Sequence, residues 1–442
     1  MIKEINPCPI LRGEVVPPGD KSISHRAILF NSIAQGKAKL TNFSPGADCG
    51  STLTCLQALG VKISSPVPEE VLSRMTDRKP TVLEVEGVGK DGLREAGDVL
   101  DAGNSATTTR LLAGLLAAQP FLSIITGDNS LRSRPMDRLI SPLRLMGANI
   151  WGRGKDSLAP LAIKGGKLHG INYSLPIASA QLKSAILIAT LFSEGETTID
   201  EPSLSRDHTE RLLQAMGAII KRDGCHISLT PLTSPLSPID LHIPGDISSA
   251  AYWLVLGAIH PNAHIKVQEV GINPTRTGII DVLLQMGAKL RIENQRWSGG
   301  EPVADISIQS SELCGVQIEG ELIPRLIDEI PVIAVAACAA KGTTLIKDAS
   351  ELRVKETDRI SNTVSELYKL GAKVEELPDG MYIRGGAKLH GTECSSYGDH
   401  RLAMALGVAG LITEGKTVLH DAEVVEISYP AFWQDMDRIK KV

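Results

Sequence analysis

Aromatic side chains are scarce in this sequence, and other marks of particular protein classes are missing. Phe, Trp and Tyr make up only 3% of the 442 residues, too few for a surface on which nucleic-acid bases stack. The formal net charge is −5, so no global basic field attracts nucleic acid. Any anion that the protein binds must therefore be held by a local cluster of cations.

No long hydrophobic run is present either. The longest apolar stretches, residues 331–340 and 402–412, have about half the length that a membrane-spanning helix needs. The first residues, MIKEINPCPI, lack the apolar core of a secretory signal. The seven cysteines form no Cys-x-x-Cys pair, which favours reduced thiols. We therefore expect a cytoplasmic protein that makes no membrane contact.

Metal and nucleophile motifs are also missing. His260 and His264 are separated by Pro-Asn-Ala, which favours a turn, and no Cys/His quartet exists. No Gly-x-Ser-x-Gly elbow is present. Hydrophobic residues make up 43% and charged residues 22%, which is ordinary for a globular protein. We expect a globular chain without a bound metal ion.

Two stretches imitate nucleotide-binding motifs. Residues 87–92 match Gly-x-Gly-x-x-Gly, but no apolar helix follows them directly, so we interpret them as a surface turn. Residues 13–22 resemble a P-loop with one residue too many and with Asp20 before Lys21. Residues 64–98 are rich in Pro, Gly and charge and predict a surface excursion.

The chain repeats itself. The pattern [Leu/Met]-Gly-[Ala/Val]-x-[apolar] occurs five times, each time after an amphipathic stretch. The five glycines are Gly60, Gly147, Gly217, Gly287 and Gly371. A glycine in this place predicts a helix that ends at a C′ glycine and is followed by a strand.

A second pattern, of helices rich in small apolar residues, occurs six times. Such helices are apolar nearly all round and should be buried, whereas the amphipathic helices should face solvent. The copies begin at SHRAILF, ATTTRLL, SAQLKSA, SSAAYWL, IPVIAVA and HRLAMAL. Six units predict an α/β (α+β type) fold with two domains, each of three βαβαββ-like units around buried parallel helices.

The sixth unit has no counterpart of the Leu-Gly-Ala strand, and an unmatched strand precedes the first unit. We therefore expect the N-terminal strand to complete the domain of the last unit. The predicted domains are residues 21–245 and residues 1–20 plus 246–442, and a cleft between two such domains is the default ligand site.

Several predicted buried helices begin with residues that suit anions. Lys21, Ser22 and Arg26 gather at one helix start, where free N–H groups and the helix dipole attract negative charge. GNSAT (103–107), SAQ (179–181) and GDHR (398–401) open three others. Each start alone is also compatible with a capped helix and solvated cations. A convergent set favours an anion site.

Three further stretches carry charge. Arg134 lies in SLRSRPMDR, a predicted loop before an amphipathic helix. Lys355, Glu356 and Arg359 lie in ELRVKETDR, which fits either an exposed helix start with i,i+4 pairs or arginine clamps around a proton-transferring carboxylate. Asp328 and Glu329 precede a buried helix, which fits either an N-cap or a general base.

Seven motifs occur in order along nearly the whole chain: PGDKSISHR, GNSAT, RSRPM, SAQLKSA, IDEIP, ELRVKETDR and GDHRLAMA. In them the sequence resembles the 5-enolpyruvylshikimate-3-phosphate synthase (EPSP synthase) family. The resemblance implies the two-domain enolpyruvyl transferase fold. It also implies transfer of the enolpyruvyl group of phosphoenolpyruvate to the 5-hydroxyl of shikimate 3-phosphate, with release of phosphate, on the route to chorismate and the aromatic amino acids.

The same resemblance implies the partners of the protein. It implies no cofactor and no metal, only the two small-molecule substrates, and a monomer that contacts neither nucleic acid nor membrane. Shikimate 3-phosphate would be bound mainly by residues 21–245, whereas the other domain would carry phosphoenolpyruvate and the acid/base residues.

The resemblance assigns residues motif by motif. Asp328 would take the proton from the attacking hydroxyl, and Glu356 and Lys21 would serve proton transfer. The residues implied for shikimate 3-phosphate are Lys21, Ser22, Arg26, Ser179, Ala180, Gln181, Arg206, Asp328 and Lys355. Those implied for phosphoenolpyruvate are Lys21, Asn104, Ala106, Arg134, Gln181, Glu356, Arg359, His400 and Arg401.

The sequence departs from the family at two places. Many members read GNAGT where this chain has GNSAT, so Ala106 stands at a glycine position beside phosphoenolpyruvate, and we expect its methyl group to crowd glyphosate and make the enzyme tolerant of this inhibitor. SRDHT, with Arg206, resembles the glyphosate-tolerant subgroup. Some members carry a Lys near the C-terminus where this chain has Ile427, which puts a phosphate ligand there in doubt.

Two alternatives remain on the same fold. UDP-N-acetylglucosamine enolpyruvyl transferase shares the fold and chemistry but places a Cys before its Arg-Pro, where this chain reads GDNSLRSRP. An inactive anion-binding scaffold would have lost acid/base groups such as Asp328, Glu356 and Lys21, all of which are present.

Overall fold

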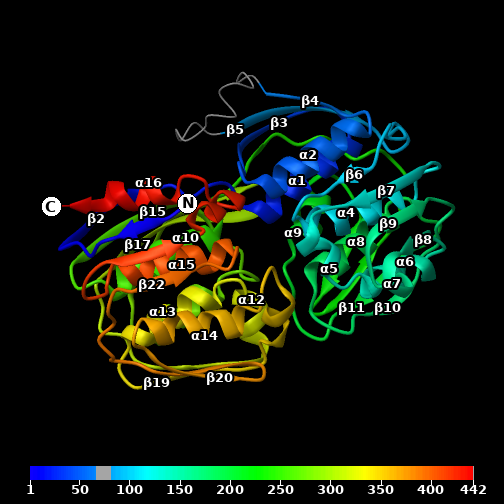
Figure 1. Ribbon diagram of the computed structural model, residues 1–442. Coiled ribbons are helices and arrows are strands. Elements are labelled where there is room, and N and C mark those ends of the chain that lie inside the picture. Colours follow the sequence, from blue (N-terminus) through cyan, green and yellow to red (C-terminus); the bar gives the residue numbers. More distant parts are fainter. Residues whose placement is uncertain (66–80, 442) are drawn as a thin grey trace. The chain divides into compact units, whose positions relative to one another are not determined.

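The structure is a computed structural model and describes residues 1–65 and 81–441. The chain divides into two compact units (Figure 1). Unit 1 comprises residues 1–18, 244–297 and 302–442, and unit 2 comprises residues 19–243 and 298–301. None of the helices in the described residues is both long and apolar enough to cross a membrane.

Within its described residues, unit 2 contains three mixed sheets. The first has the order β14-β3-β5-β4, from β14 (Leu241–His242), β3 (Gln35–Phe43), β5 (Thr81–Val88) and β4 (Lys62–Ser64). The second has β6 (Leu100–Asp101), β7 (Leu122–Thr126), β9 (Leu158–Lys164) and β8 (Asn149–Gly152). The third has β10 (Asn172–Ser174), β11 (Thr197–Asp200), β13 (His226–Leu229) and β12 (Ile220–Asp223).

Unit 2 encloses buried helices with the sheets and amphipathic helices around them. The buried helices are α1 (Lys21–Ile33), α4 (Ala106–Leu116) and α8 (Ala180–Thr190). The amphipathic ones are α2 (Ala47–Ala58), α6 (Asp137–Leu145) and α9 (His208–Ala215). Two short helices, α5 (Asn129–Ser133) and α7 (Arg153–Asp156), lie in the second repeat.

Unit 1 has the same plan over its described residues. Its first sheet has the order β16 (Lys289–Ser298), β17 (Glu301–Gln309), β15 (Ala263–Gly271), β2 (Ile10–Val15) and β24 (Lys440–Lys441). The second has β18 (Gln317–Ile318), β19 (Thr343–Ile346), β21 (Gly380–Arg384) and β20 (Lys373–Leu377). The third has β1 (Lys3–Ile5), β23 (Thr417–His420) and β22 (Glu393–Ser395).

In Figure 1 the buried helices of unit 1 lie between its sheets, with β15 and β17 on one side and β19 and β20 on the other. These helices are α10 (Ile247–Ile259), α13 (Ile330–Ala339) and α15 (His400–Gly410). The others are α11 (Gly278–Gln285), α12 (Ile323–Leu326), α14 (Arg359–Lys369) and α16 (Phe432–Ile439), with the 3₁₀ segments η1 (Gly320–Leu322), η2 (Ser350–Val354) and η3 (Ala422–Ile427).

The sheets repeat one topology. A short strand pairs in parallel with the strand that follows the buried helix, as β6 does with β7. An antiparallel pair, such as β9 and β8, continues the sheet. The order β6-α4-β7-α6-β8-β9 is therefore a βαβαββ unit. This mixed α/β arrangement confirms the predicted fold class.

The N-terminal strand completes unit 1, as predicted, but it is two strands rather than one. β1 pairs antiparallel with β23, with Lys3 opposite Leu419, and so completes the last sheet. β2 pairs in parallel with β15 and so begins the sheet of the fourth repeat. The break between them contains Pro7 and Pro9, which have no backbone N–H to continue a ladder.

The repeated glycines end amphipathic helices, as predicted. The glycines that follow α2, α6, α9, α11 and α14 have φ values of +90°, +99°, +95°, +93° and +90°. Residues with a Cβ reach this left-handed region only at a cost in free energy. The glycine turns the chain from each helix into the next strand.

The predicted surface excursion is wrong for residues 81–88, which form β5 between β3 and β4 in the first sheet of unit 2. Gly87 belongs to this strand and pairs with Gly36. Residues 89–98 form no helix or strand, and all of them except Leu93 are at least partly exposed, as predicted. Residues 66–80 of the predicted excursion lie outside the described residues.

The glycine turns give a matched test of backbone strain. An added Cβ meets nothing within 4 Å at Gly217, where φ is +95°, or at Gly50, inside α2. We expect Gly217→Ala to lower the free energy of unfolding by about 1–2 kcal/mol and Gly50→Ala to raise it by about 0.5–1 kcal/mol. Urea unfolding measures both, and equal effects of the two variants would contradict the assignment.

Candidate active site

The carboxylate of Asp328 lies among three cations of unit 1. Its Oδ1 is 3.5 Å from Lys355 Nζ and 3.4 Å from Arg359 Nη1. Its Oδ2 is 3.7 Å from Arg401 Nη2. Arg401 Nη1 also donates to the Asp328 backbone carbonyl at 3.4 Å. Three cations thus converge on one carboxylate, and such a convergence suits a site for anions.

The chain brings these residues together at the starts of buried and amphipathic helices. Asp328 and Glu329 lie between α12 and α13. Of this pair, Glu329 takes the N-cap position of α13, without a side-chain cap bond, and Asp328 does not. The exposed-helix interpretation of ELRVKETDR is wrong, because α14 begins only at Arg359, capped by Asp358.

Arg359 is the buried centre of this cluster, with only 1% of its side chain exposed. Its Nε donates to Asp399 Oδ2 at 2.7 Å, and its Nη2 donates to Glu356 Oε2 at 2.5 Å. Burial lowers the pKa of the guanidinium, but Asp399 and Glu356 outweigh burial and raise the pKa above its usual value. Arg359 is therefore a permanent cation with a fixed position.

The start of α15 supplies a second fixed cation. Asp399 caps the helix by accepting hydrogen bonds from the backbone N–H groups of Arg401 and Leu402. His400 follows as a buried first helical residue. Burial lowers the pKa of Arg401, but Asp328, with smaller contributions from Tyr252, Glu329 and Asp246, outweighs burial and holds that pKa well above the usual value.

Unit 2 gathers the first group of its predicted residues at the start of α1. Lys21 is the first helical residue, earlier than the helix start predicted at Ser22–Ser24, because the Asp20 side chain caps the helix by accepting from the Ile23 N–H. Lys21 Nζ donates to Asp48 Oδ2 at 2.5 Å. Ser22 follows with partial burial.

Arg26 is fixed one turn further into α1. Its Nε donates to Thr209 Oγ1 and its Nη2 to Ser184 Oγ, both at 2.7 Å. Burial lowers the pKa of Arg26 to about 10, partly offset by the nearby carboxylate of Glu210. At neutral pH the group remains a cation whose position is set by bonds to α8 and α9.

The starts of α4 and α8 form the second group. Gln181 Nε2 donates to Thr107 Oγ1 at 2.8 Å, and Gln181 Oε1 accepts from Arg110 Nη1. Ser105 caps α4, so Ala106, 7% exposed, is its first residue. Ser179 caps α8, whose first residue is Ala180, by accepting from the Leu182 N–H at 3.4 Å.

Arg134 joins this group from a neighbouring loop. Its Nη2 donates to Asn104 Oδ1 at 2.8 Å. The predicted loop is partly helical, because residues 129–133 form α5, and Arg134 is its extended C-cap. The residue before a proline avoids helical backbone, and Pro135 follows. Arg206, partly buried, lies in the segment before α9 and is one of the charges that act on Arg26.

Some residues of these clusters were not predicted from the sequence. Asp48 pairs with Lys21, and Arg110 holds Gln181. In unit 1 the buried Arg276 donates from Nη2 to Ser248 Oγ at 2.7 Å, and its Nη2 is 3.8 Å from Glu329 Oε1. The only sequence signal is a charged residue at the start of, or just before, an amphipathic or buried helix.

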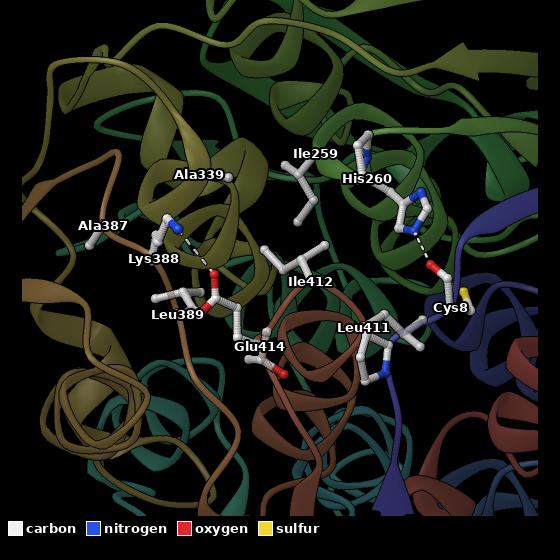
Figure 2. Close-up of a pocket in the computed structure, with 13 residues that line it drawn as sticks. Cys8, Ile259, His260, Ala339, Ala387, Lys388, Leu389, Leu411, Ile412 and Glu414 are labelled. Carbon is white, nitrogen blue, oxygen red and sulfur yellow. Dashed lines mark hydrogen bonds and ion pairs between the residues drawn. The ribbon is translucent and has the colours of Figure 1, made fainter.

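A pocket of about 340 Å³ in unit 1 lies away from these groups (Figure 2). It is lined by the last residues of two buried helices, Ile259 and Ala339, and by Leu411, the C-cap of α15. Asp328 and Arg401 lie at the opposite ends, about 15 Å away for a ten-residue helix. The carbonyl ends of helices are negative and disfavour anions, so this pocket does not suit anionic substrates.

The family model described as EPSP synthase (3-phosphoshikimate 1-carboxyvinyltransferase) matches residues 5–436. The chain belongs to the EPSP synthase family. The predicted family, its fold and the enzyme class 3-phosphoshikimate 1-carboxyvinyltransferase are thereby confirmed.

Relatives of the family match along the whole chain. A 3-phosphoshikimate 1-carboxyvinyltransferase of Herpetosiphon aurantiacus is 53% identical over 98% of this chain and 97% of its own length. One of Desulforudis audaxviator is 50% identical over 100% of both. The solved EPSP synthase of Acinetobacter baumannii is 42% identical, has a TM-score of 0.87 and matches 99% of this chain and 98% of that chain.

The Arg359 cluster predicts an acid-dependent stability. Burial raises the pKa of Asp399, but Arg359 outweighs burial, so the pKa lies below its usual value. The pair thus stabilises the fold above the unfolded pKa of about 3.9, and this contribution is lost as pH falls through the folded pKa. We expect Asp399→Asn, which keeps the helix cap, to lower the free energy of unfolding at pH 7 by about 3–5 kcal/mol.

Urea unfolding from pH 7 down to about pH 2 measures this dependence. The difference between wild type and Asp399→Asn should stay constant down to about pH 4 and shrink below it, because the carboxylate of the unfolded chain becomes protonated near its usual pKa of about 3.9, whereas that of the folded chain is protonated only at lower pH. Asp421→Asn, at an exposed acid of unit 1, is the control. A difference that stays constant down to about pH 2 would show that the ion pair does not cause it.

Proposed function

We propose that this chain catalyses the family reaction with the residues described above. It transfers the enolpyruvyl group of phosphoenolpyruvate to the 5-hydroxyl of shikimate 3-phosphate and releases phosphate. The observation that carries the proposal is the position of Asp328 among Lys355, Arg359 and Arg401. A base beside fixed cations is what this reaction needs, because both substrates are anions.

Shikimate 3-phosphate is held mainly by unit 2 in this proposal. Arg26 and Arg206 are the cations for its phosphate, and the start of α8 supplies hydroxyl, amide and backbone N–H donors. Helix starts bind phosphate because their free N–H groups and dipole favour negative charge. The full proposed set is Lys21, Ser22, Arg26, Ser179, Ala180, Gln181, Arg206, Asp328 and Lys355.

Phosphoenolpyruvate has its own cations. Arg134, Arg359 and Arg401 carry rigid guanidinium groups, which match carboxylate and phosphate oxygens in pairs. Lys21, Asn104, Ala106, Gln181, Glu356 and His400 complete the proposed set. Lys21 pairs with Asp48, Arg359 with Asp399 and Arg401 with Asp328.

Bound anions change that pairing. As substrate oxygens engage Lys355, Arg359 and Arg401, those cations compensate Asp328 less strongly, so the carboxylate becomes a better base in the presence of substrate. Asp328 then removes the proton of the 5-hydroxyl as the oxygen attacks C2 of phosphoenolpyruvate. A proton delivered to the enol CH₂ by Lys21 or Glu356 completes the addition.

Elimination reverses the proton transfer. A proton leaves the new methyl group of the tetrahedral intermediate, the C2–O bond to phosphate breaks, and the enolpyruvyl ether remains on the 5-oxygen. Fixed Arg and Lys side chains stabilise the negative charge on the departing phosphate, which is the main electrostatic contribution. No electron transfer is needed at any step.

The finer assignments belong to the same proposal. The two functional domains are residues 21–245 and residues 1–20 plus 246–442, and the active species is a cytoplasmic monomer. Sedimentation of the purified protein tests the monomer. A dimer at the concentration used in the assay would overturn it.

Phosphate release is the direct test of the proposed function. Purified protein is given phosphoenolpyruvate with either shikimate 3-phosphate or UDP-N-acetylglucosamine. We expect release only with shikimate 3-phosphate. Release only with the nucleotide sugar would assign the chain to the related transferase, and no release with either acceptor would favour an anion-binding scaffold.

Asp328→Asn tests the general base. Loss of a positioned base costs about 10²- to 10⁴-fold, so kcat should fall by at least about 10²-fold. The variant keeps the shape of the side chain and removes its charge. Glu351→Gln, on η2 in the same unit, is the control. A fall in kcat below tenfold would contradict the assigned role.

Ala106→Gly tests the predicted tolerance of glyphosate. Ala106 is buried at the first position of α4, and we propose that its methyl group crowds glyphosate more than the smaller phosphoenolpyruvate. We expect the inhibition constant for glyphosate to fall by at least about tenfold, as expected when a steric conflict is relieved, with a smaller change in the KM for phosphoenolpyruvate. An inhibition constant that does not change would contradict the proposed role of the Ala106 methyl group.

A further inference from the structure

A buried ion network lies behind the start of α8. Lys183, one turn into that helix, has no exposed side-chain surface. Its Nζ is 2.9 Å from Glu201 Oε2 and 2.7 Å from Glu210 Oε1. A lysine is very rarely buried to this extent unless it is paired, and here one ammonium holds two carboxylates from different elements.

A second group of ion pairs balances the negative charge of Glu201 and Glu210. Arg222 on β12 approaches Glu201, Glu210 and Asp207 at 3.6, 3.5 and 3.5 Å. Arg211 Nε donates to Asp207 Oδ1 at 2.9 Å. The network thus contains three cations, Lys183, Arg211 and Arg222, and three carboxylates. Removal of Lys183 would leave Glu201 and Glu210 with unbalanced charge.

The network fixes both neighbours of Arg206. Glu201, held by Lys183, accepts a hydrogen bond from Ser205 Oγ through its Oε1. Asp207, on the other side of Arg206, is held by Arg211 and Arg222. The backbone position from which Arg206 projects is therefore set by two ion-paired acids.

The same network borders the partners of Arg26. Lys183 and Ser184 are adjacent on α8, and Glu210 and Thr209 are adjacent on α9. The ion pair of Lys183 with Glu210 therefore lies beside the contact of Ser184 Oγ with Thr209 Oγ1, at 2.7 Å. Both hydroxyls receive hydrogen bonds from Arg26.

We propose that Lys183 is a positioning residue for acceptor binding, which fixes Arg26 and Arg206 through the Lys183–Glu201–Glu210 network. The proposal rests on the proposed function, in which these two arginines bind shikimate 3-phosphate. It makes Lys183 specific for that substrate, since the network reaches the substrate through Arg26 and Arg206.

Lys183→Met is the first test. A displacement of about 1 Å in a binding group costs up to about 100-fold, so we expect the Kd and KM for shikimate 3-phosphate to rise at least about tenfold. We expect kcat at saturation and the KM for phosphoenolpyruvate to change less than about threefold. Ile186→Val, a buried change on the same helix, controls for general destabilisation.

Two further variants keep the test decisive if Lys183→Met folds poorly. Ser205→Ala removes the bond to Glu201 without burying a charge and should raise the KM for shikimate 3-phosphate about fivefold, the equivalent of one hydrogen bond. The double variant Lys183→Met/Glu210→Gln rebalances the network and should bind shikimate 3-phosphate more tightly than Lys183→Met.

The outcomes separate the two proposals. Suppose that the wild-type chain releases phosphate and that the KM for shikimate 3-phosphate is unchanged in both Ser205→Ala and Lys183→Met. This result overturns the role of Lys183 and leaves the proposed function standing. Equal rises in both KM values, or a rise with Ile186→Val as large as that with Lys183→Met, overturn it too. A wild-type chain that releases no phosphate overturns the proposed function, and isothermal titration with shikimate 3-phosphate then tests the network separately.

Discussion

The rest of this structure depends on the burial of helices that begin with charged and polar residues. Each helix start leaves backbone N–H groups without partners, and such groups are costly inside a protein. Asp20, Asp246 and Asp399 cap α1, α10 and α15, and Ser105 and Ser179 cap α4 and α8. Because the caps satisfy the first N–H groups internally, the apolar bodies of these helices can form the cores while their polar starts remain together. The clusters of proposed site residues lie at these starts and not at the opposite ends.

Both clusters have the same electrostatic design. Each cation is matched by an acid of the chain, as Arg359 is by Asp399 and Lys21 by Asp48. A cluster of unpaired cations would repel itself and destabilise the fold, whereas these pairs keep each guanidinium or ammonium in place before a ligand arrives. The arrangement is preorganised, so little rearrangement of the protein is needed when charge develops on a substrate.

Local patterns predicted much of this structure. The glycines after α2, α6, α9, α11 and α14 could be predicted because few residues other than glycine adopt a left-handed backbone. The six buried helices could be predicted because a helix that is buried on all sides has no polar face. The proposed site residues are those that a motif carried, and their roles stay predictions. Asp48 and Lys183 were not among them, since the partner of Lys21 lies 27 residues away and Lys183 looks like one polar interruption of an apolar helix. The sequence TVLEVE of β5 is strand-like, but these residues were included in the predicted surface excursion because the stretch around them is rich in Pro, Gly and charge. The register of β5 with β3 is set by residues far back in the chain.

The position of the first 18 residues has a consequence for the order in which the chain can fold. Unit 2 consists almost wholly of one continuous stretch, residues 19–243. β1 and β2, by contrast, are made first but pair with β23 and β15, which are made much later. Domains generally fold as units during synthesis, so unit 2 has its sequence complete while the N-terminal strands still lack partners. This N-terminal segment contains four prolines, which have no backbone N–H donor: Pro7, Pro9, Pro17 and Pro18. They reduce the chance that the still unpaired segment adds to the edge of a wrong sheet.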